Sequence, residues 1–160
     1  MRILGIDPGY ERLGIAVLEK TPKVSPREQV IFSECFKTSA KLEFNERLFL
    51  IGEEVKKIIK KYKPEVLAIE TLFLNTNHKT VMKVAEVRGV VIYEATCAGL
   101  KVFEASPPQI KIATTGYGKA NKEQIMKMVK ILVDIDNSKT SDDELDAIAI
   151  ALTASAHMRL

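Results

Sequence analysis

The sequence predicts an α/β domain built on one mixed β-sheet. Three apolar segments near the start, at residues 2–7, 13–19 and 28–37, are typical of successive antiparallel strands. The rest of the chain alternates between helical periodicity and short apolar segments. A length of 160 residues, with 46% hydrophobic and 28% charged residues, suits a single domain over residues 1–160 with one substantial core.

The next two elements follow from their local patterns. Apolar residues recur every three or four positions over residues 43–62, which predicts an amphipathic helix with its lysines on the solvent side. Pro64 ends that helix. The short, continuously apolar segment 65–70 is typical of a strand covered on both faces.

The second half of the chain predicts four helices and one strand. Ser106 and Pro107 form a start signal for a short helix, as a cap and a first-turn proline. In chain order, the elements are a helix at 77–98, a strand at 101–105, the short helix from Ser106, and helices at 121–134 and 142–157.

The helix at 77–98 is apolar around most of its circumference, so we expect it to be covered on two sides. In a domain of this size, the sheet can cover one side and a second subunit the other. Gly89 would permit close approach of the partner backbone. The alternative is a helix buried wholly within its own chain.

Charge and cysteine usage set broad limits on function. A net charge of +3 and a pI near 8.8 are only weak evidence for a polyanionic partner. Cys35 and Cys97 match no zinc spacing, and we expect both to be reduced core thiols. No basic-then-apolar leader or membrane-length apolar segment is evident, which predicts a cytoplasmic protein.

Two apolar strands end in an acid. Asp7 follows the first strand in "GIDPG", and Glu70 ends "VLAIE". If these strands are parallel neighbours, both acids emerge at their carboxyl ends, where open α/β sheets place their sites. A buried, unpaired carboxylate costs several kcal/mol, so Asp7 requires a cation or a donor as a partner.

The last helix supplies two more acids. Ser141 and Glu144 have capping-box spacing, which explains Glu144 locally. Asp146 is the only charge in "LDAIAIAL", and Asp143 lies on the same side of the helix. Each of the four acids alone has an ordinary explanation, but together they favour a shared Mg²⁺ site. Two such ions can clamp the attacking water and the leaving oxygen of a phosphodiester.

Four segments carry a family resemblance: "GIDPG...LGIAV", "AIETLF", "KVFEASPPQIKIATTGYGKANKEQI" and "DELDAIAIALTASAH". In order and spacing, they resemble the bacterial RuvC Holliday-junction resolvases. These are homodimeric, Mg²⁺-dependent endonucleases of the ribonuclease-H-like superfamily. The resemblance implies one ribonuclease-H-like nuclease domain with a five-stranded mixed sheet flanked by helices. It also implies resolution of four-way DNA junctions by paired phosphodiester hydrolysis that leaves 5′-phosphate and 3′-hydroxyl ends.

The resemblance also implies roles for individual residues and partners. Phe73 takes the place of the family's base-stacking aromatic, whereas Pro108 stands where an arginine is common. Asp142, beside Asp143, leaves two candidates for the fourth ligand. The implied partners are a second copy of the chain, bound through the helix at 77–98, and the branch-migration proteins RuvA and RuvB. The implied cofactors are two Mg²⁺ ions per site, replaceable by Mn²⁺, held by the catalytic acids Asp7, Glu70, Asp143 and Asp146.

The basic residues and the loop aromatic also have a physical reading. Lys111, Lys119 and Lys122 surround the glycine-rich turn "TGYGKAN", whose backbone can approach phosphates closely. The alternative is a simple loop between helices. Phe73 lies in a polar segment and either stacks on DNA bases or packs under the sheet edge.

Other functions remain open at this point. "GIDPG" also resembles the first phosphate loop of actin-like ATPases, but the chain lacks a second glycine-rich phosphate loop and a duplicated domain. A ribonuclease-H-like relative acting on structured RNA, or a non-catalytic junction-binding protein, is the remaining alternative. Such relatives usually lack the basic "QIK...GYGKANKEQ" segment.

Overall fold

The computed structural model describes residues 1–20, 28–72, 78–135 and 140–158. Its strands are β1 (Arg2–Asp7), β2 (Arg12–Glu19), β3 (Glu28–Lys37), β4 (Val66–Glu70), β5 (Lys101–Ala105) and β6 (Val133–Asp134). Its helices are α1 (Phe44–Tyr62), α2 (His78–Cys97), α3 (Pro107–Thr115), α4 (Lys122–Leu132) and α5 (Asp142–His157). Every helix and strand that the sequence predicted is therefore present.

The strands form one mixed sheet in the order β5-β4-β1-β2-β3-β6. The antiparallel strands β1, β2 and β3 form its centre, and β4, β5 and β6 add to it in parallel. The prediction of five strands is wrong by one, because Val133 and Asp134 pair with the start of β3. A strand of two residues is too short to show a period, so the sequence assigned it to the end of the preceding helix.

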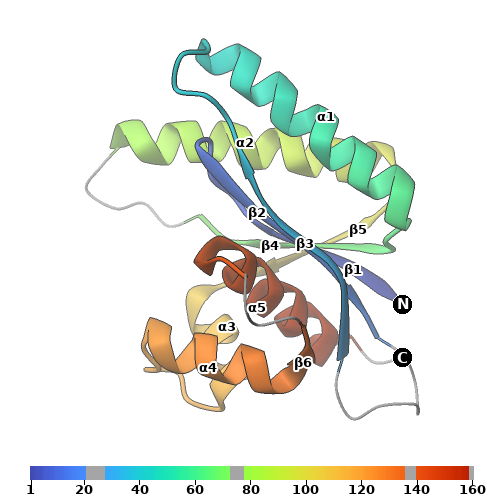
Figure 1. Ribbon diagram of the computed structural model, residues 1–160, viewed down its shortest axis with the longest axis vertical. Coiled ribbons are helices and arrows are strands. Elements are labelled where there is room, and N and C mark those ends of the chain that lie inside the picture. The colour runs from blue at the N-terminus through green and yellow to red at the C-terminus, as the bar shows by residue number, and fades with distance from the viewer. Residues whose placement is uncertain (21–27, 73–77, 136–139, 159–160) are drawn as a thin grey trace.

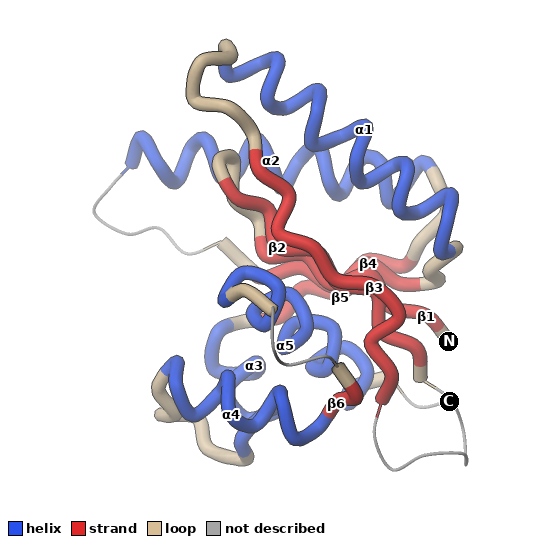
Figure 2. Tube along the Cα trace, in the orientation of Figure 1, coloured by secondary structure: helices blue, strands red, loops and turns tan. Residues whose placement is uncertain are grey.

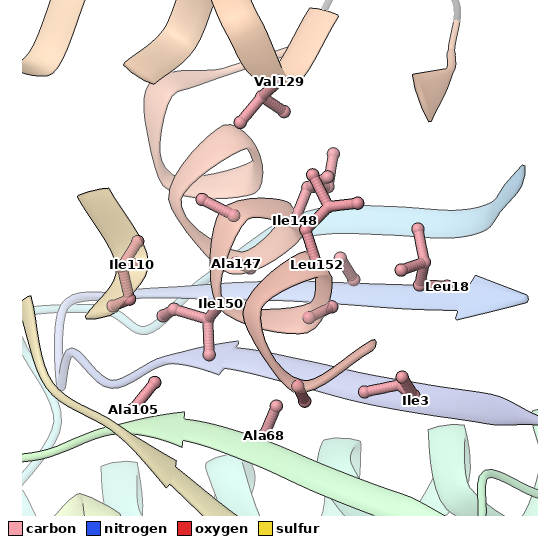
Figure 3. Close-up of a cluster of buried hydrophobic side chains, with 14 of the residues drawn as sticks. Ile3, Leu18, Ala68, Ala105, Ile110, Val129, Ala147, Ile148, Ile150 and Leu152 are labelled. Carbon is pink, nitrogen blue, oxygen red and sulfur yellow. The ribbon is translucent and has the colours of Figure 1, made fainter. Parts of the chain in front are cut away.

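Helices cover both faces of the sheet. Figures 1 and 2 show α1 and α2 on one face and α3, α4 and α5 on the other. Side chains of β1 alternate between these layers: Leu4 and Ile6 pack toward α1 and α2, whereas Ile3 packs toward α5. Figure 3 shows Ile148 and Leu152 of α5 lying over the strands in this second core.

α5 lies unusually close to β1 and β2. A Cβ atom on Gly5 would stand 2.2 Å from the Ala147 carbonyl oxygen, and one on Gly14 would stand 2.2 Å from the Asp143 carbonyl oxygen. No side chain tolerates such contacts, so these two strand glycines let the helix approach. The first turn of α5 is thereby held against the β1–β2 hairpin.

Two expectations about the cell compartment can be compared with the fold. Both cysteines are free, but Cys97, at the end of α2, is exposed. The prediction of a core thiol is therefore wrong for Cys97, because the last turn of α2 turns this side outward. Within the described ranges, no helix is long and apolar enough to cross a membrane.

Candidate active site

The two strand acids meet at one edge of the sheet. β1 and β4 are parallel, and Ile6 lies opposite Ile69, so Asp7 and Glu70 follow side by side. Both line a pocket of about 320 Å³ at the carboxyl ends of these strands. The sequence prediction that these acids converge is confirmed in geometry.

α5 brings the third acid into the same pocket. Asp146, on the second turn of the helix, lines the pocket with Asp7 and Glu70. A capping box sets the start of the helix: the Ser141 Oγ accepts a hydrogen bond from the Glu144 backbone N–H, and the Glu144 carboxylate accepts one from the Ser141 N–H. Ser33 Oγ donates a further hydrogen bond to Glu144 at 2.7 Å, which ties this turn to β3.

Asp143 approaches the site from the hairpin side. Gly14 lies opposite Asp7 in the β1–β2 ladder, and its missing side chain leaves room for the Asp143 backbone. Asp143 is not among the residues that line the pocket, but its charge is close enough to raise the pKa of Asp7. The four predicted acids thus gather around one edge of the sheet, three within the pocket and one beside it.

Burial and repulsion by neighbouring acids make Asp7 and Glu70 hard to ionise. Burial, followed by the charges of Asp146, Glu70 and Asp143, raises the pKa of Asp7 from 3.8 to about 7. Burial and Asp146 also raise the pKa of Glu70, and Arg88 partly offsets this. A cation in the pocket would favour the ionised carboxylates and so lower the pKa values of both Asp7 and Glu70.

Two basic side chains pair with the helix acids. The Lys122 Nζ atom donates a hydrogen bond to Asp146 Oδ2 at 2.9 Å, and Arg12 Nη2 donates one to Asp143 Oδ2 at 2.5 Å. The hydrogen bond to Asp146 raises the pKa of Lys122. Among the described residues, no three histidine, cysteine or acidic side chains are arranged to hold one ion.

The donor set nevertheless fits a hard divalent cation. Asp7, Glu70 and Asp146 offer only carboxylate oxygens, the ligands that Mg²⁺ prefers. Lys122 supplies one positive charge against these three acids, and its side chain is 59% exposed. Because the Lys122 side chain is mostly exposed, a metal ion could displace it from Asp146 and leave its ammonium group in water.

The other predicted site residues have mixed positions. Lys111 and Lys122 line the pocket, whereas Lys119 is exposed and does not. Asp142 is exposed on the first turn of α5 and is not a pocket residue. Phe73 lies outside the described residues.

Sequence reasoning missed two arginines. Arg12 pairs with Asp143, and Arg88 hydrogen-bonds to the Glu70 backbone oxygen and to Glu104 Oε2. Arg88 is 8% exposed and so anchors the end of β4 from α2. The sequence signal that could have identified Arg88 is an arginine closely flanked by the apolar residues Val87, Val90 and Val91.

Comparison with known proteins identifies the family. The family model described as crossover junction endodeoxyribonuclease RuvC matches residues 3–154. The chain belongs to the RuvC family. The RuvC protein of Caldanaerobacter subterraneus subsp. tengcongensis is 44% identical over 95% of this chain and 90% of that protein. The Thermosipho melanesiensis RuvC is 39% identical over 99% of each.

Solved RuvC structures share the fold. The structure of Thermus thermophilus RuvC in complex with Holliday junction substrate has a TM-score of 0.90 and 31% identity, and covers 98% of this chain and 94% of that one. The chain therefore has the ribonuclease-H-like fold that the resemblance implied. The yeast mitochondrial Holliday junction resolvase Ydc2, with 14% identity and a TM-score of 0.69, shares the fold alone.

Proposed function

We propose that this RuvC-family chain resolves four-way DNA junctions by metal-dependent hydrolysis at the pocket of Asp7, Glu70 and Asp146. Family membership supports the reaction and the junction substrate over ATP hydrolysis, RNA cleavage or binding without cleavage. The observation that carries the location is the convergence of three acids from β1, β4 and α5 at one edge of the sheet.

Asp7, Glu70, Asp143 and Asp146 are the proposed metal ligands and catalytic residues. Divalent ions bound there, with Mg²⁺ as the physiological candidate and Mn²⁺ as a substitute, would supply Lewis-acid stabilisation of the charge that develops at the scissile phosphate. Asp7 is the central ligand, because its burial and three acidic neighbours make it the acid most in need of a counter-charge. Asp143 and Asp146 would release Arg12 and Lys122 when they turn to a metal.

Lys111, Lys119 and Lys122 are the proposed contacts for the DNA backbone. Lys111 and Lys122 flank the acids, so each can hold a phosphate oxygen while the neighbouring phosphodiester lies over Asp7. Lys122, once free of Asp146, would retain its charge for this contact. Phe73, the residue proposed to stack on bases, follows β4 by three positions.

A homodimer through α2 would deliver two matched cuts. Met82 and Tyr93 of α2 are 63% and 65% exposed, which argues against burial of the helix wholly within its own chain. Tyr93 lines a shallow groove between α1 and α2 that also includes Phe49 and Gly89. A two-fold axis across this surface would pair two active sites on a two-fold symmetric junction. Association with RuvA and RuvB is proposed on family grounds alone.

The test is Mg²⁺-dependent nicking of a mobile four-way junction, with the strand ends mapped. We expect paired cuts with 5′-phosphate and 3′-hydroxyl ends. Asp7→Asn should bind the junction as tightly as the wild type but cut it at least about 10³-fold more slowly, because the central ligand is lost. Asp142→Asn, an exposed neighbour of the proposed ligand Asp143, is the matched control and should cut normally. Nicking by Asp7→Asn at the wild-type rate would refute the site.

A further inference from the structure

A second positively charged site lies on the other side of the hairpin from Lys111 and Lys122. We name it the Tyr10 cluster: Tyr10, Phe44, Arg47, Lys79 and Lys83. The Arg47 Cζ atom is 5.1 Å and the Lys83 Nζ atom 5.2 Å from the centre of the Tyr10 ring. Lys83 also lies 5.3 Å from the Phe44 ring, and Tyr10, Lys79 and Lys83 line a pocket of about 400 Å³.

Among the residues that the structure describes, ion pairs do not neutralise the three cations of the cluster. Within the described part of the chain, none of Arg47, Lys79 and Lys83 forms an ion pair with a carboxylate. Arg47 is only 6% exposed, and its Nη2 atom has no hydrogen-bond partner among the described residues. Contact with an aromatic ring leaves the cation its full charge, so the site still attracts an anion.

Hydrogen bonds and ring contacts hold the cluster in a defined arrangement. Thr38 Oγ1 donates to the Tyr10 carbonyl oxygen at 2.5 Å and accepts a hydrogen bond from Arg47 Nε at 2.8 Å. The Tyr10 and Phe44 rings meet edge to face, with centres 5.9 Å apart. Arg47 therefore places a fixed positive charge against the rings that Lys83 also contacts. Lys79 lies one turn before Lys83 on the same side of α2 and adds a second ammonium group.

The position of the cluster connects it to the site of hydrolysis. Tyr10 follows Asp7 by three residues in the β1–β2 turn, and Figure 1 shows the start of α2 beside this turn. Lys111 and Lys122 lie on the opposite face, on α3 and α4. Asp7 thus lies between two groups of cations, and a DNA backbone that crosses the sheet edge would meet both.

We propose that the Tyr10 cluster binds a backbone phosphate of the junction on the α2 side of the cut, with Lys79 and Lys83 as the direct contacts. Arg47 is a positioning residue: it contacts the Tyr10 ring and adds positive charge to the site without touching the phosphate. This inference rests on the proposed function, because it takes the ligand to be the DNA that the pocket cuts. The contact is with phosphate and so carries no base preference.

The test is junction binding in metal-free buffer across a range of salt concentrations. Replacing Lys79 and Lys83 by Gln should weaken binding about tenfold and lower the salt slope by about 1, as expected for one lost phosphate contact. At saturating junction with Mg²⁺, the cutting rate should stay near wild type, so that KM rises and kcat does not fall. Lys83→Arg, which keeps a charge over the rings, should bind as the wild type does.

The matched control removes two lysines at the far end of α1, Lys60→Gln with Lys61→Gln. Lys61 also stacks on an aromatic ring, 4.9 Å from the centre of Tyr62. The Tyr62 carbonyl oxygen accepts a hydrogen bond from Arg2, at the opposite end of β1 from Asp7. This control changes the net charge equally and should retain wild-type affinity and salt slope.

Two results would overturn the proposal: wild-type affinity and slope in the Lys79/Lys83 double variant, or an equal loss in the control. If the double variant melts early, Lys79→Gln alone decides the question, because no ring contact of Lys79 is lost; its salt slope must still fall. Failure of the wild type to nick junctions would instead refute the proposed function, and the binding comparison would stand separately.

Discussion

On one face of the sheet, α5 lies so close to β1 and β2 that only glycine fits at positions 5 and 14. On the other face, α1 and α2 leave Phe49, Met82 and Tyr93 between 63% and 67% exposed. Both faces cover the same strands, and each has its own apolar core. They differ in what remains for function: the first places acids within contact of β1, and the second presents apolar surface outward.

This difference indicates how a small α/β chain can separate two tasks. The α5 face needs close, rigid packing, because charges that repel one another must be held together near Asp7. The α1–α2 face exposes apolar surface that the proposed dimer would bury. A substitution on one face of the sheet can therefore test one task and leave the other face intact.

The largest effect concerns the charge at Asp7. The folded pKa of about 7 exceeds the ordinary value of 3.8, so folding favours the protonated acid. The contribution of Asp7 to metal-free stability is therefore fully present below about pH 4 and is lost as pH rises through 7, by at most about 4 kcal/mol. Asp7→Asn carries no such charge and should be the more stable protein at pH 8, with little difference at pH 4.

Thermal melts in chelator across that pH range provide the measurement. Asp142→Asn is the control, because its side chain is exposed, and should follow the wild-type curve. Adding Mg²⁺ at pH 8 should raise the melting temperature of the wild type and leave Asp7→Asn unchanged. Parallel curves for wild type and Asp7→Asn would mean that Asp7 is not held among like charges.

The next effect concerns the contact between β2 and α5. Gly14→Ala adds a Cβ atom 2.2 Å from the Asp143 carbonyl oxygen and so must displace the first turn of α5. We expect a loss of about 1–3 kcal/mol in the free energy of unfolding and slower nicking. Gly118→Ala, whose nearest neighbour would be Ile112 at 3.5 Å, should be tolerated in denaturant titration. Equal stability of the two variants would show that α5 does not depend on this contact.

The smallest effect concerns the outer face of α2. Gly89 has nothing within 4 Å of an added Cβ among the described residues, so Gly89→Ala should stabilise the isolated chain by about 0.5–1 kcal/mol. If α2 forms the dimer interface by close approach, the same methyl group should weaken the dimer. Sedimentation at several concentrations should then show that the Gly89→Ala dimer dissociates at a higher protein concentration than the wild-type dimer. If the Gly89→Ala dimer is as tight as the wild-type dimer, Gly89 does not lie in the interface.

The sequence predicted the location of the acids better than their partners. Asp7 and Glu70 could be placed together because parallel strands end at one edge, and Asp146 stood out as the only charge on an apolar helix face. The pairing of Arg12 with Asp143 joins residues 131 positions apart, and no periodicity encodes it.

The close approach at Gly14 illustrates a second limit. A glycine inside a strand indicates that something comes near, but the sequence does not say which element. β6 was missed for a related reason, because its two residues acquire strand character only by pairing with β3. Local pattern therefore predicted the elements, whereas contacts between distant segments completed the site.

The central claim is that Asp7, Glu70, Asp143 and Asp146 share divalent metal at one edge of the sheet. Anomalous diffraction from crystals soaked in Mn²⁺ tests it most directly, since Mn²⁺ also prefers oxygen ligands. The account predicts strong anomalous peaks between Asp7, Glu70 and the α5 acids, with Lys122 and Arg12 turned away. Peaks only at Asp142 or elsewhere on the surface, with the Lys122–Asp146 pair intact, would contradict it.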